Sequence, residues 1–261
     1  MKRYIYIIIA LLITTKLSHG QYAYFPVEGS IEYDKTVHVK NLLKRHISTL
    51  KDDAFSKKIF EDMIDKVSET AVLKKKLAFR GEEMSLENVE QTHPPMINNL
   101  LRQGLLDYQQ TVYQNLEKSI SKSSFDIGGS PILVQDSLLK VKWKITNEYR
   151  NIAGYECRRA NGVTLDSVYV VAFYTDQIPT SAGPGTIHGL PGMILGLVVP
   201  EQHYNIYATK VDFSQPTLKT NIGGRRDTPM TRKETQDKLK EILGRWMSDQ
   251  QFNLVMAAML L

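Results

Sequence analysis

Four residues of the types that bind soft metal ions occur in the second half of the chain, namely Cys157, His188, Met193 and His203. Thiol, thioether and imidazole groups together are ligands suited to copper. The sequence does not fix the distances between them. Each also has an ordinary explanation, because cysteine and methionine pack in apolar cores and histidine is common in solvated loops. We therefore expect no cofactor, with a periplasmic copper-handling protein as the alternative.

Short catalytic motifs give no support to the common enzyme classes. The chain has no Gly-x-Ser-x-Gly elbow, phosphate loop, dinucleotide fingerprint, Cys-x-x-Cys or His-Glu-x-x-His. His188 lies among glycines, where an exposed ring could act as a base or a ligand, but no partner stands at a defined spacing from it. We predict no catalytic residue, and an unrecognised hydrolase is the third hypothesis.

The loop that holds His188 reads TSAGPGTIHGLPGMILGL over residues 180 to 197. Proline presets φ for the second position of a type II turn and glycine supplies the positive φ needed at the third. Pro191 and Gly192 fit these positions, so we expect a type II turn there. The loop is then a rigid connection that delivers a strand over Met193 to Val199.

The N-terminus has the three parts of a secretory signal peptide. Lys2 and Arg3 precede an apolar run from Tyr4 to Ile13, and Ser18-His19-Gly20 forms the cleavage region. The run is too short to span a bilayer comfortably, and no cysteine follows for lipid attachment. We expect residues 1–20 to be removed, and the protein to lie in the periplasm or cell envelope of a Gram-negative bacterium, with release from the cell left open.

Charge and cysteine content narrow the class of protein further. The signal peptide takes three of the 33 basic residues with it, which leaves 30 against 28 acidic residues and a net charge of +2. Basic residues are interleaved with acidic ones, whereas a nucleic-acid binder has a clustered basic face. We expect no nucleic-acid partner. A single cysteine cannot form an internal disulfide, so stability must come from apolar burial.

Apolar periodicity predicts the elements that position these residues. A helical spacing over Asp52 to Val67 indicates an amphipathic helix with one face to bury. The apolar stretch Met96 to Leu106 is ambiguous in its pattern, and we interpret it as a short helix before a strand near Thr111 to Leu116. Thr231 and Glu234 form a capping box. The helix that follows carries an apolar stripe of Leu239, Ile242, Leu243 and Trp246.

The strands are predicted from alternation with a period of two. Val141 to Ile145 and Tyr155 to Arg159 alternate, and Val168 to Tyr174 is apolar on both faces, which favours a central strand covered by the C-terminal helix. His203 to Phe213 alternates less cleanly, as a strand near an edge does. The expected fold is α+β: residues 21–261 form one domain, a curved antiparallel sheet with a helix from the N-terminal half and a C-terminal helix packed on one face.

A resemblance to a known family rests on two signatures in order. The first is Trp143-Lys144-Ile145 followed by Ile152 to Ala160, and the second is the glycine loop; Gly29 to Tyr33 resembles the family's first strand. Together they resemble the GLPGLI family, a set of exported bacterial proteins of unassigned function. Met193 stands where the family name has leucine, and Phe173 replaces an expected tryptophan. The structural motif comprises Gly183, Pro184, Gly189, Leu190, Pro191 and Gly192.

The resemblance implies export and a β-rich body, and it supplies no catalytic assignment. With the features above, it favours a noncatalytic binding or accessory protein of the bacterial cell envelope. The expected partner is an unknown envelope protein or an apolar small ligand. We expect no membrane span once the signal peptide is removed.

Overall fold

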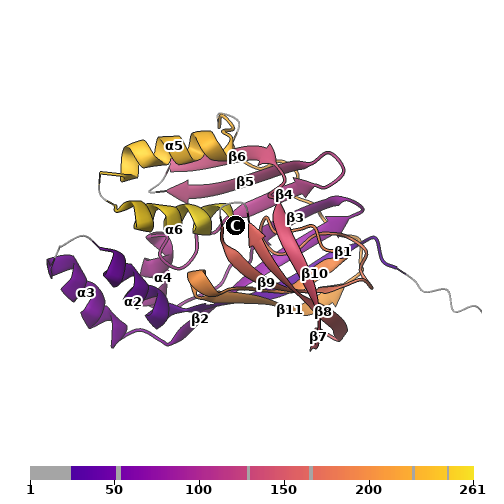
Figure 1. Cartoon of the computed structure of the whole chain (residues 1–261), viewed down its shortest axis with the longest axis horizontal. Coiled ribbons are helices and arrows are strands. Elements are labelled where there is room, and N and C mark those ends of the chain that lie inside the picture. Colours follow the sequence, from indigo (N-terminus) through magenta and orange to yellow (C-terminus); the bar gives the residue numbers. More distant parts are fainter. Residues whose placement is uncertain (1–24, 51–53, 128–129, 165–166, 225–226, 246) are drawn as a thin grey trace, which may run out of the picture.

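A computed structural model describes residues 25–50, 54–127, 130–164, 167–224, 227–245 and 247–261. It is an α+β structure built on one curved antiparallel sheet of eleven described strands, as the sequence predicts (Figure 1). The strand order is β6-β5-β4-β3-β2-β1-β11-β10-β9-β8-β7. The strands are β1 (Glu28–His38), β2 (Thr70–Arg80), β3 (Glu83–Asn88), β4 (Thr111–Asn115), β5 (Ile120–Ile127), β6 (Ser130–Ser137), β7 (Val141–Ile152), β8 (Tyr155–Thr164), β9 (Tyr169–Thr175), β10 (Met193–Val199) and β11 (Tyr204–Asp212).

Strand β11 lies in the middle of the sheet, between β1 and β10. The prediction of a position near an edge is therefore wrong. Its alternation is mixed because Ile206 and Ala208 are buried, whereas the next two residues, Thr209 and Lys210, are both exposed. Pairing of β11 with β1 also brings the first described strand and the last one together.

Most of the described helices pack on one face of the sheet, which we call the inner face. It carries Ile31, Tyr33 and Val37 of β1. Helices α2 (Val39–Thr49) and α4 (Pro95–Arg102) cover the end of this face at Val37, and helices α5 (Arg232–Leu243) and α6 (Asp249–Leu260) cover β5 and β6. Short helix η2 (Pro200–Gln202) joins β10 to β11.

The amphipathic helix expected over Asp52 to Val67 is α3 (Ala54–Ile64), and it buries much less than predicted. None of its residues is fully buried, and Phe55 and Ile59 are 76% and 44% exposed. The reason is its position: α2 already covers the sheet, and α3 packs against α2. Its last turns contribute only half-buried side chains to the core, those of Phe60, Met63 and Ile64.

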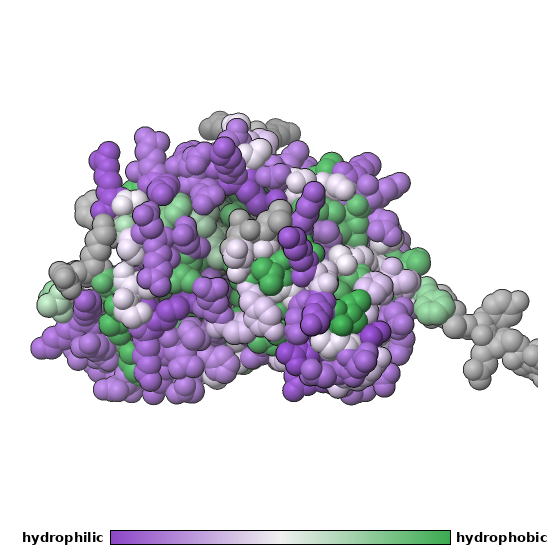
Figure 2. Space-filling view, in the orientation of Figure 1, coloured by the Kyte–Doolittle hydropathy of each residue, from purple (hydrophilic) through white to green (hydrophobic). Residues whose placement is uncertain are grey.

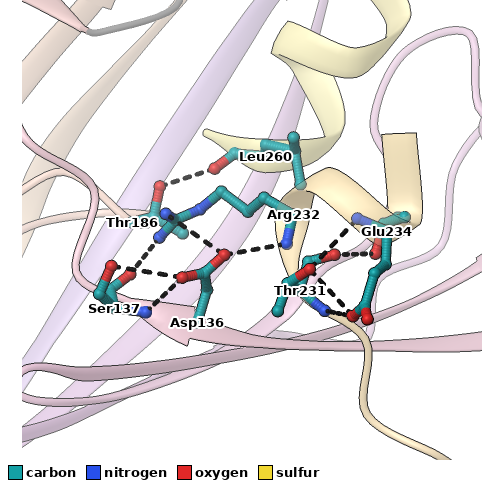
Figure 3. A network of polar contacts seen from close by, with 8 residues as sticks. Asp136, Ser137, Thr186, Thr231, Arg232, Glu234 and Leu260 are labelled. Atoms are coloured by element: carbon teal, nitrogen blue, oxygen red, sulfur yellow. Dashed lines mark hydrogen bonds and ion pairs between the residues drawn. The ribbon is translucent and has the colours of Figure 1, made fainter. Parts of the chain in front are cut away.

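The capping box at the start of α5 is confirmed, with the Thr231 hydroxyl accepting from the Glu234 backbone N–H (Figure 3). The Arg232 backbone N–H donates to Asp136 at the end of β6, which fixes α5 on the sheet edge. The predicted apolar stripe is only partly buried, since Leu239 is 3% exposed but Ile242 is 54% exposed. Trp246 lies outside the described residues.

The expected cover of β9 by the helix after Thr231 is also wrong, because α5 packs on Phe125, Ile132 and Val134 of β5 and β6. Strand β9 is instead covered on the inner face by the loop residues Ile187 and Leu190 and by Leu261 after α6. The run from Phe252 onward packs rather than spans, as predicted. No helix among the described residues has the length and apolarity that a membrane span requires, and hydrophilic residues cover most of the face in Figure 2.

The glycine loop between β9 and β10 lies against the inner face and fills the space that the curved sheet encloses. Ile178, Ala182, Ile187 and Leu190 of the loop are buried in two core clusters. Hydrogen bonds at Thr186 also hold the loop: the Gln114 amide donates to the Thr186 carbonyl at 3.1 Å, and the Thr186 hydroxyl donates to the Leu260 carbonyl at 2.8 Å. The prediction of a rigid loop is consistent with these contacts.

The turn at Pro191-Gly192 differs from the predicted type II turn. Gly192 has a φ of 147°, well beyond the value of about 80° in a type II turn. Its N–H donates to the Leu190 carbonyl, and the Met193 N–H donates to Ile178 instead. Glycine is needed for an additional reason, since a Cβ at this position would lie 2.1 Å from the Thr175 carbonyl oxygen.

Candidate functional site

Two lysines stand at core positions of neighbouring strands on the inner face. Lys35 follows Tyr33 and precedes Val37 in the buried alternation of β1, and Lys75 lies between Leu73 and Leu77 on β2. The register places Lys35 opposite Leu73 and Lys75 opposite Tyr33. Lys35 is 8% exposed and Lys75 is 4% exposed. Burial of an ammonium group is costly unless a partner offsets it.

Asp107, in the segment between α4 and β4, is that partner. Its two carboxylate oxygens lie 2.8 Å from Nζ of Lys35 and 2.7 Å from Nζ of Lys75. Lys75 also donates to the Asn88 side chain at 2.7 Å, and Asn88 donates to the Gln109 carbonyl at 2.6 Å. We call Lys35, Lys75 and Asp107 the charged cluster. It links β1, β2 and the segment after α4 by charge-assisted hydrogen bonds.

Burial and the opposite charge of the partner shift the pKa values of this cluster in opposite directions. Burial by itself raises the pKa of Asp107, but the nearby Lys35 and Lys75 ammonium groups outweigh it and hold that pKa well below its usual range. For Lys35, burial lowers the pKa, the charge of Asp107 partly restores it, and the charge of Lys75 lowers it again. Asp107 is thus ionised at neutral pH and shared between two cations.

Two tyrosines complete the surroundings. Nζ of Lys35 lies 4.1 Å from the ring centroid of Tyr204, within the range of a cation–π contact. Burial raises the pKa of Tyr204, and burial also raises the pKa of Tyr108 to about 12. Both phenols are therefore neutral at physiological pH, and their rings make the contacts, Tyr204 with Lys35 and Tyr108 edge-to-face with Phe125.

Three pockets meet at Asp107. The large pocket has a volume of about 720 Å³ and lies between β2, β3 and α4. The small pocket, about 70 Å³, lies between α2, the segment 104–108 and α6. The inner pocket, about 30 Å³, places the charged cluster beside Pro184 and Gly185 of the glycine loop. The predicted structural motif therefore forms one wall next to this cluster.

The residues considered for copper are placed in different surroundings. Cys157 and Met193 lie in one apolar core cluster and are both fully buried. Cys157 is a free thiol there, as its place on a strand suggested. Burial raises the pKa of this thiol to about 12, so it is protonated at neutral pH.

The two histidines stand apart from that apolar cluster. His188 is half-buried, and its Nε2 is buried with no hydrogen-bond partner among the described residues. His203 ends η2 and its carbonyl accepts from the His38 N–H. Burial lowers the pKa of both rings. Within the described ranges, no three His, Cys, Asp or Glu residues form a group that could hold a metal ion.

The sequence contained a signal for the charged cluster that composition and motifs do not reveal. A lysine interrupts the apolar alternation at Tyr33-x-Lys35-x-Val37 and again at Leu73-x-Lys75-x-Leu77. Lysine is almost never fully buried without a partner, so a register that places both on the inner face predicts a buried acid. Which acid serves depends on the path of the chain between α4 and β4.

Fold and site together define a curved-sheet α+β protein with a buried charged cluster beneath open pockets. Residues 161–196, which include β9, the glycine loop and the start of β10, match the model of a family described as "Protein of unknown function (Porph_ging)". No curated protein matches the chain.

Fourteen chains of solved structures are similar to this one. One, described as "Structure of PNGF-II in P21 space group", covers 81% of this chain at 13% identity and a TM-score of 0.49. The match covers 33% of that chain, so this protein spans about one third of its length. A likeness at this level does not extend to function.

Proposed function

We propose that this chain is an exported, noncatalytic binding protein of the bacterial cell envelope, and that it holds a small zwitterionic ligand in the large pocket. The family match over 161–196 contains the whole Gly183 to Gly192 motif, which supports a GLPGLI-type protein. The signal peptide expected over residues 1–20 supports export, although these residues lie outside the described ones. A partner protein in the envelope is compatible with the same role.

The lining of the large pocket is the observation that carries this proposal. Lys74 and Arg102 bring positive charges, and Glu90 and Asp107 bring negative ones. Amide groups and a few apolar side chains lie between them, from Asn88, Gln91, Asn98, Gln109, Leu73, Val89 and Leu101. A volume of about 720 Å³ is within the range of small-molecule sites.

A lining with both signs of charge complements a ligand with separated charges, such as a short peptide. Its carboxylate would pair with Lys74 and Arg102, and its ammonium group with Glu90. The proposed ligand is thus polar, which departs from the apolar ligand expected from the sequence.

The test compares two matched substitutions. Val89 lines the large pocket and is 40% exposed, and Val163 on β8 is 42% exposed and does not line it. We expect the tripeptide trialanine, at about 100 times its Kd, to raise the Tm of the parent and of Val163→Trp by roughly 5 °C. Val89→Trp, which places a bulky indole in the pocket, should respond much less. Absence of a response in the parent, or an equal response in Val89→Trp, rejects the proposal.

Export is tested separately by the intact mass of the protein from the envelope fraction. We expect a chain that begins at Gln21 without a lipid. A retained Met1 or an added acyl chain would reject this part of the proposal and leave the pocket untouched.

A further inference from the structure

The small pocket gathers basic and amide groups next to the charged cluster. Lys35 lines it from β1 and Arg45 from α2. Arg45 donates to the Glu201 carbonyl and to the Gln202 side chain, which are both neutral acceptors. Arg45 is only half-exposed, and burial lowers the pKa of its guanidinium while the charge of Glu201 raises it. Lys35 and Arg45 therefore bring two cations to one pocket.

The charges around this pocket do not balance. Asp107 supplies one negative charge to the two ammonium groups of Lys35 and Lys75. Arg45 adds a third positive charge, and the carboxylate nearest to it belongs to the exposed Glu201, where solvent screens it. His46 also lines the pocket, and burial lowers its pKa, so it is neutral at pH 7. Among the groups that line the pocket, Lys35 and Arg45 thus bring two positive charges against the single negative charge of Asp107, and the half-buried Arg45 carries the excess.

Gln251, at the start of α6, adds an amide group to the pocket. It lines the small pocket and is 6% exposed. Its backbone N–H is bonded to the Ser248 hydroxyl, but within the described part of the chain its side-chain amide has no hydrogen bond. Its polar atoms are not among the fully buried atoms without a partner, so the amide meets the space of the pocket and is available to a bound molecule.

The rest of the lining is aliphatic, from Leu42, Leu105, Leu106, Leu254, Val255 and Ala258. A cavity needs about 10–15 Å³ to hold one water. The volume of about 70 Å³ thus has room for roughly five waters, or for an organic acid of three or four carbons.

We infer that the small pocket is a binding site for a short aliphatic carboxylate. The carboxylate lies between Lys35 and Arg45 and accepts from the Gln251 amide, and the alkyl chain contacts the aliphatic side chains of α6. Arg45 suits this task because its planar guanidinium matches the two oxygens of a carboxylate. The site is separate from the large pocket and does not depend on the function proposed for it.

Isothermal titration of the exported protein with sodium butyrate tests this assignment. We expect saturable binding with one site per chain. Butan-1-ol, which lacks the charge, and sodium phosphate, which lacks the alkyl chain, should each bind at least tenfold more weakly. Binding of phosphate as tight as that of butyrate would contradict the assignment, as would the absence of a saturable signal with butyrate.

Variants locate the site. Arg45→Gln and Gln251→Leu should each weaken butyrate binding at least tenfold at an unchanged stoichiometry. The matched control is Arg102→Gln, which removes an exposed cation of the large pocket and should leave butyrate binding within twofold of the parent. Gln251→Leu keeps the test decisive if Arg45→Gln does not fold. An equal loss in Arg102→Gln would overturn the assignment and place butyrate in the large pocket.

Discussion

The hydroxyl of Tyr33 on β1 donates a hydrogen bond of 2.7 Å to the backbone carbonyl of Ile194, two residues after Gly192. Tyr33 is fully buried, so its ring and hydroxyl tie the first described strand to the start of β10. Tyr33→Phe keeps the ring and removes the bond. We expect a loss of about 1 kcal/mol in the free energy of unfolding, or more, because a buried acceptor is left unpaired. Urea unfolding measures this loss, and an unchanged midpoint would show that the bond does not contribute.

Gly192→Ala should destabilise the protein strongly. An added Cβ would lie 2.1 Å from the Thr175 carbonyl oxygen, on a backbone with positive φ. The backbone must shift at the point where β10 enters the core, so we expect a loss of roughly 3 kcal/mol or more, as in other overpacked or strained core sites. His188→Ala, in the same loop, should change the Tm little.

Gly154 provides the control for the Gly192 prediction, because it also has a positive φ, of 87°, but a Cβ added there would meet no atom within 4 Å. Gly154→Ala should therefore cost only the conformational term, about 1 kcal/mol. Thermal melts of the two variants therefore separate the cost of a positive φ from the cost of the steric clash with Thr175. Equal losses would mean that the contact with Thr175 is not what makes glycine necessary at position 192.

Asp107→Asn should be among the most damaging substitutions of a charged residue. It leaves Lys35 and Lys75 buried without a counter-charge, and breaking a buried pair in this way costs about 3–5 kcal/mol. Because the pKa of Asp107 is lowered in the folded state, its contribution is present above its unfolded pKa and is lost as the pH falls below about 4. The parent should lose stability in this acidic range more steeply than the variant.

Asp212 is a suitable comparison for the acid unfolding of Asp107. Hydrogen bonds from Ser214 lower its pKa, but its side chain is 43% exposed, whereas Asp107 is buried. Asp212→Asn should leave the acid-unfolding curve nearly unchanged. If Asp107→Asn and Asp212→Asn gave the same curve, the charged cluster would not be the main acid-sensitive element.

The thiol of Cys157 should react slowly in the native protein. It is fully buried, and its pKa is raised to about 12 by burial, so the reactive thiolate is scarce and shielded. In Gln215→Cys, which adds an exposed cysteine, one thiol should react at once with a thiol reagent and the second only in denaturant. Rapid labelling of both thiols in the native state would reject the burial of Cys157 and revive the copper hypothesis.

Local patterns were sufficient for most elements of the fold. Alternation predicted β7 and β8, an apolar run predicted β9, and the turn at Pro191-Gly192 predicted that β10 follows it. The capping box at Thr231 and Glu234 predicted the start of α5, and the apolar stretch from Met96 predicted the short helix before Thr111. These features depend on neighbours within a few residues, where side-chain periodicity and backbone preference act directly. The fold class and the free, buried Cys157 follow from the same reasoning.

The sequence alone thus determined the strands of the second half of the chain, the helices α3, α4 and α5, and that Gly192 has a structural role, although the turn that it forms is not the predicted type. Only the tertiary structure decided that β11 lies beside β1, that α3 packs on α2, and that Asp107 meets Lys35 and Lys75. The reason is the separation in sequence. Asp107 is 72 residues from Lys35, and a contact of that range depends on how the whole sheet curves and which loop crosses it, which no local pattern encodes.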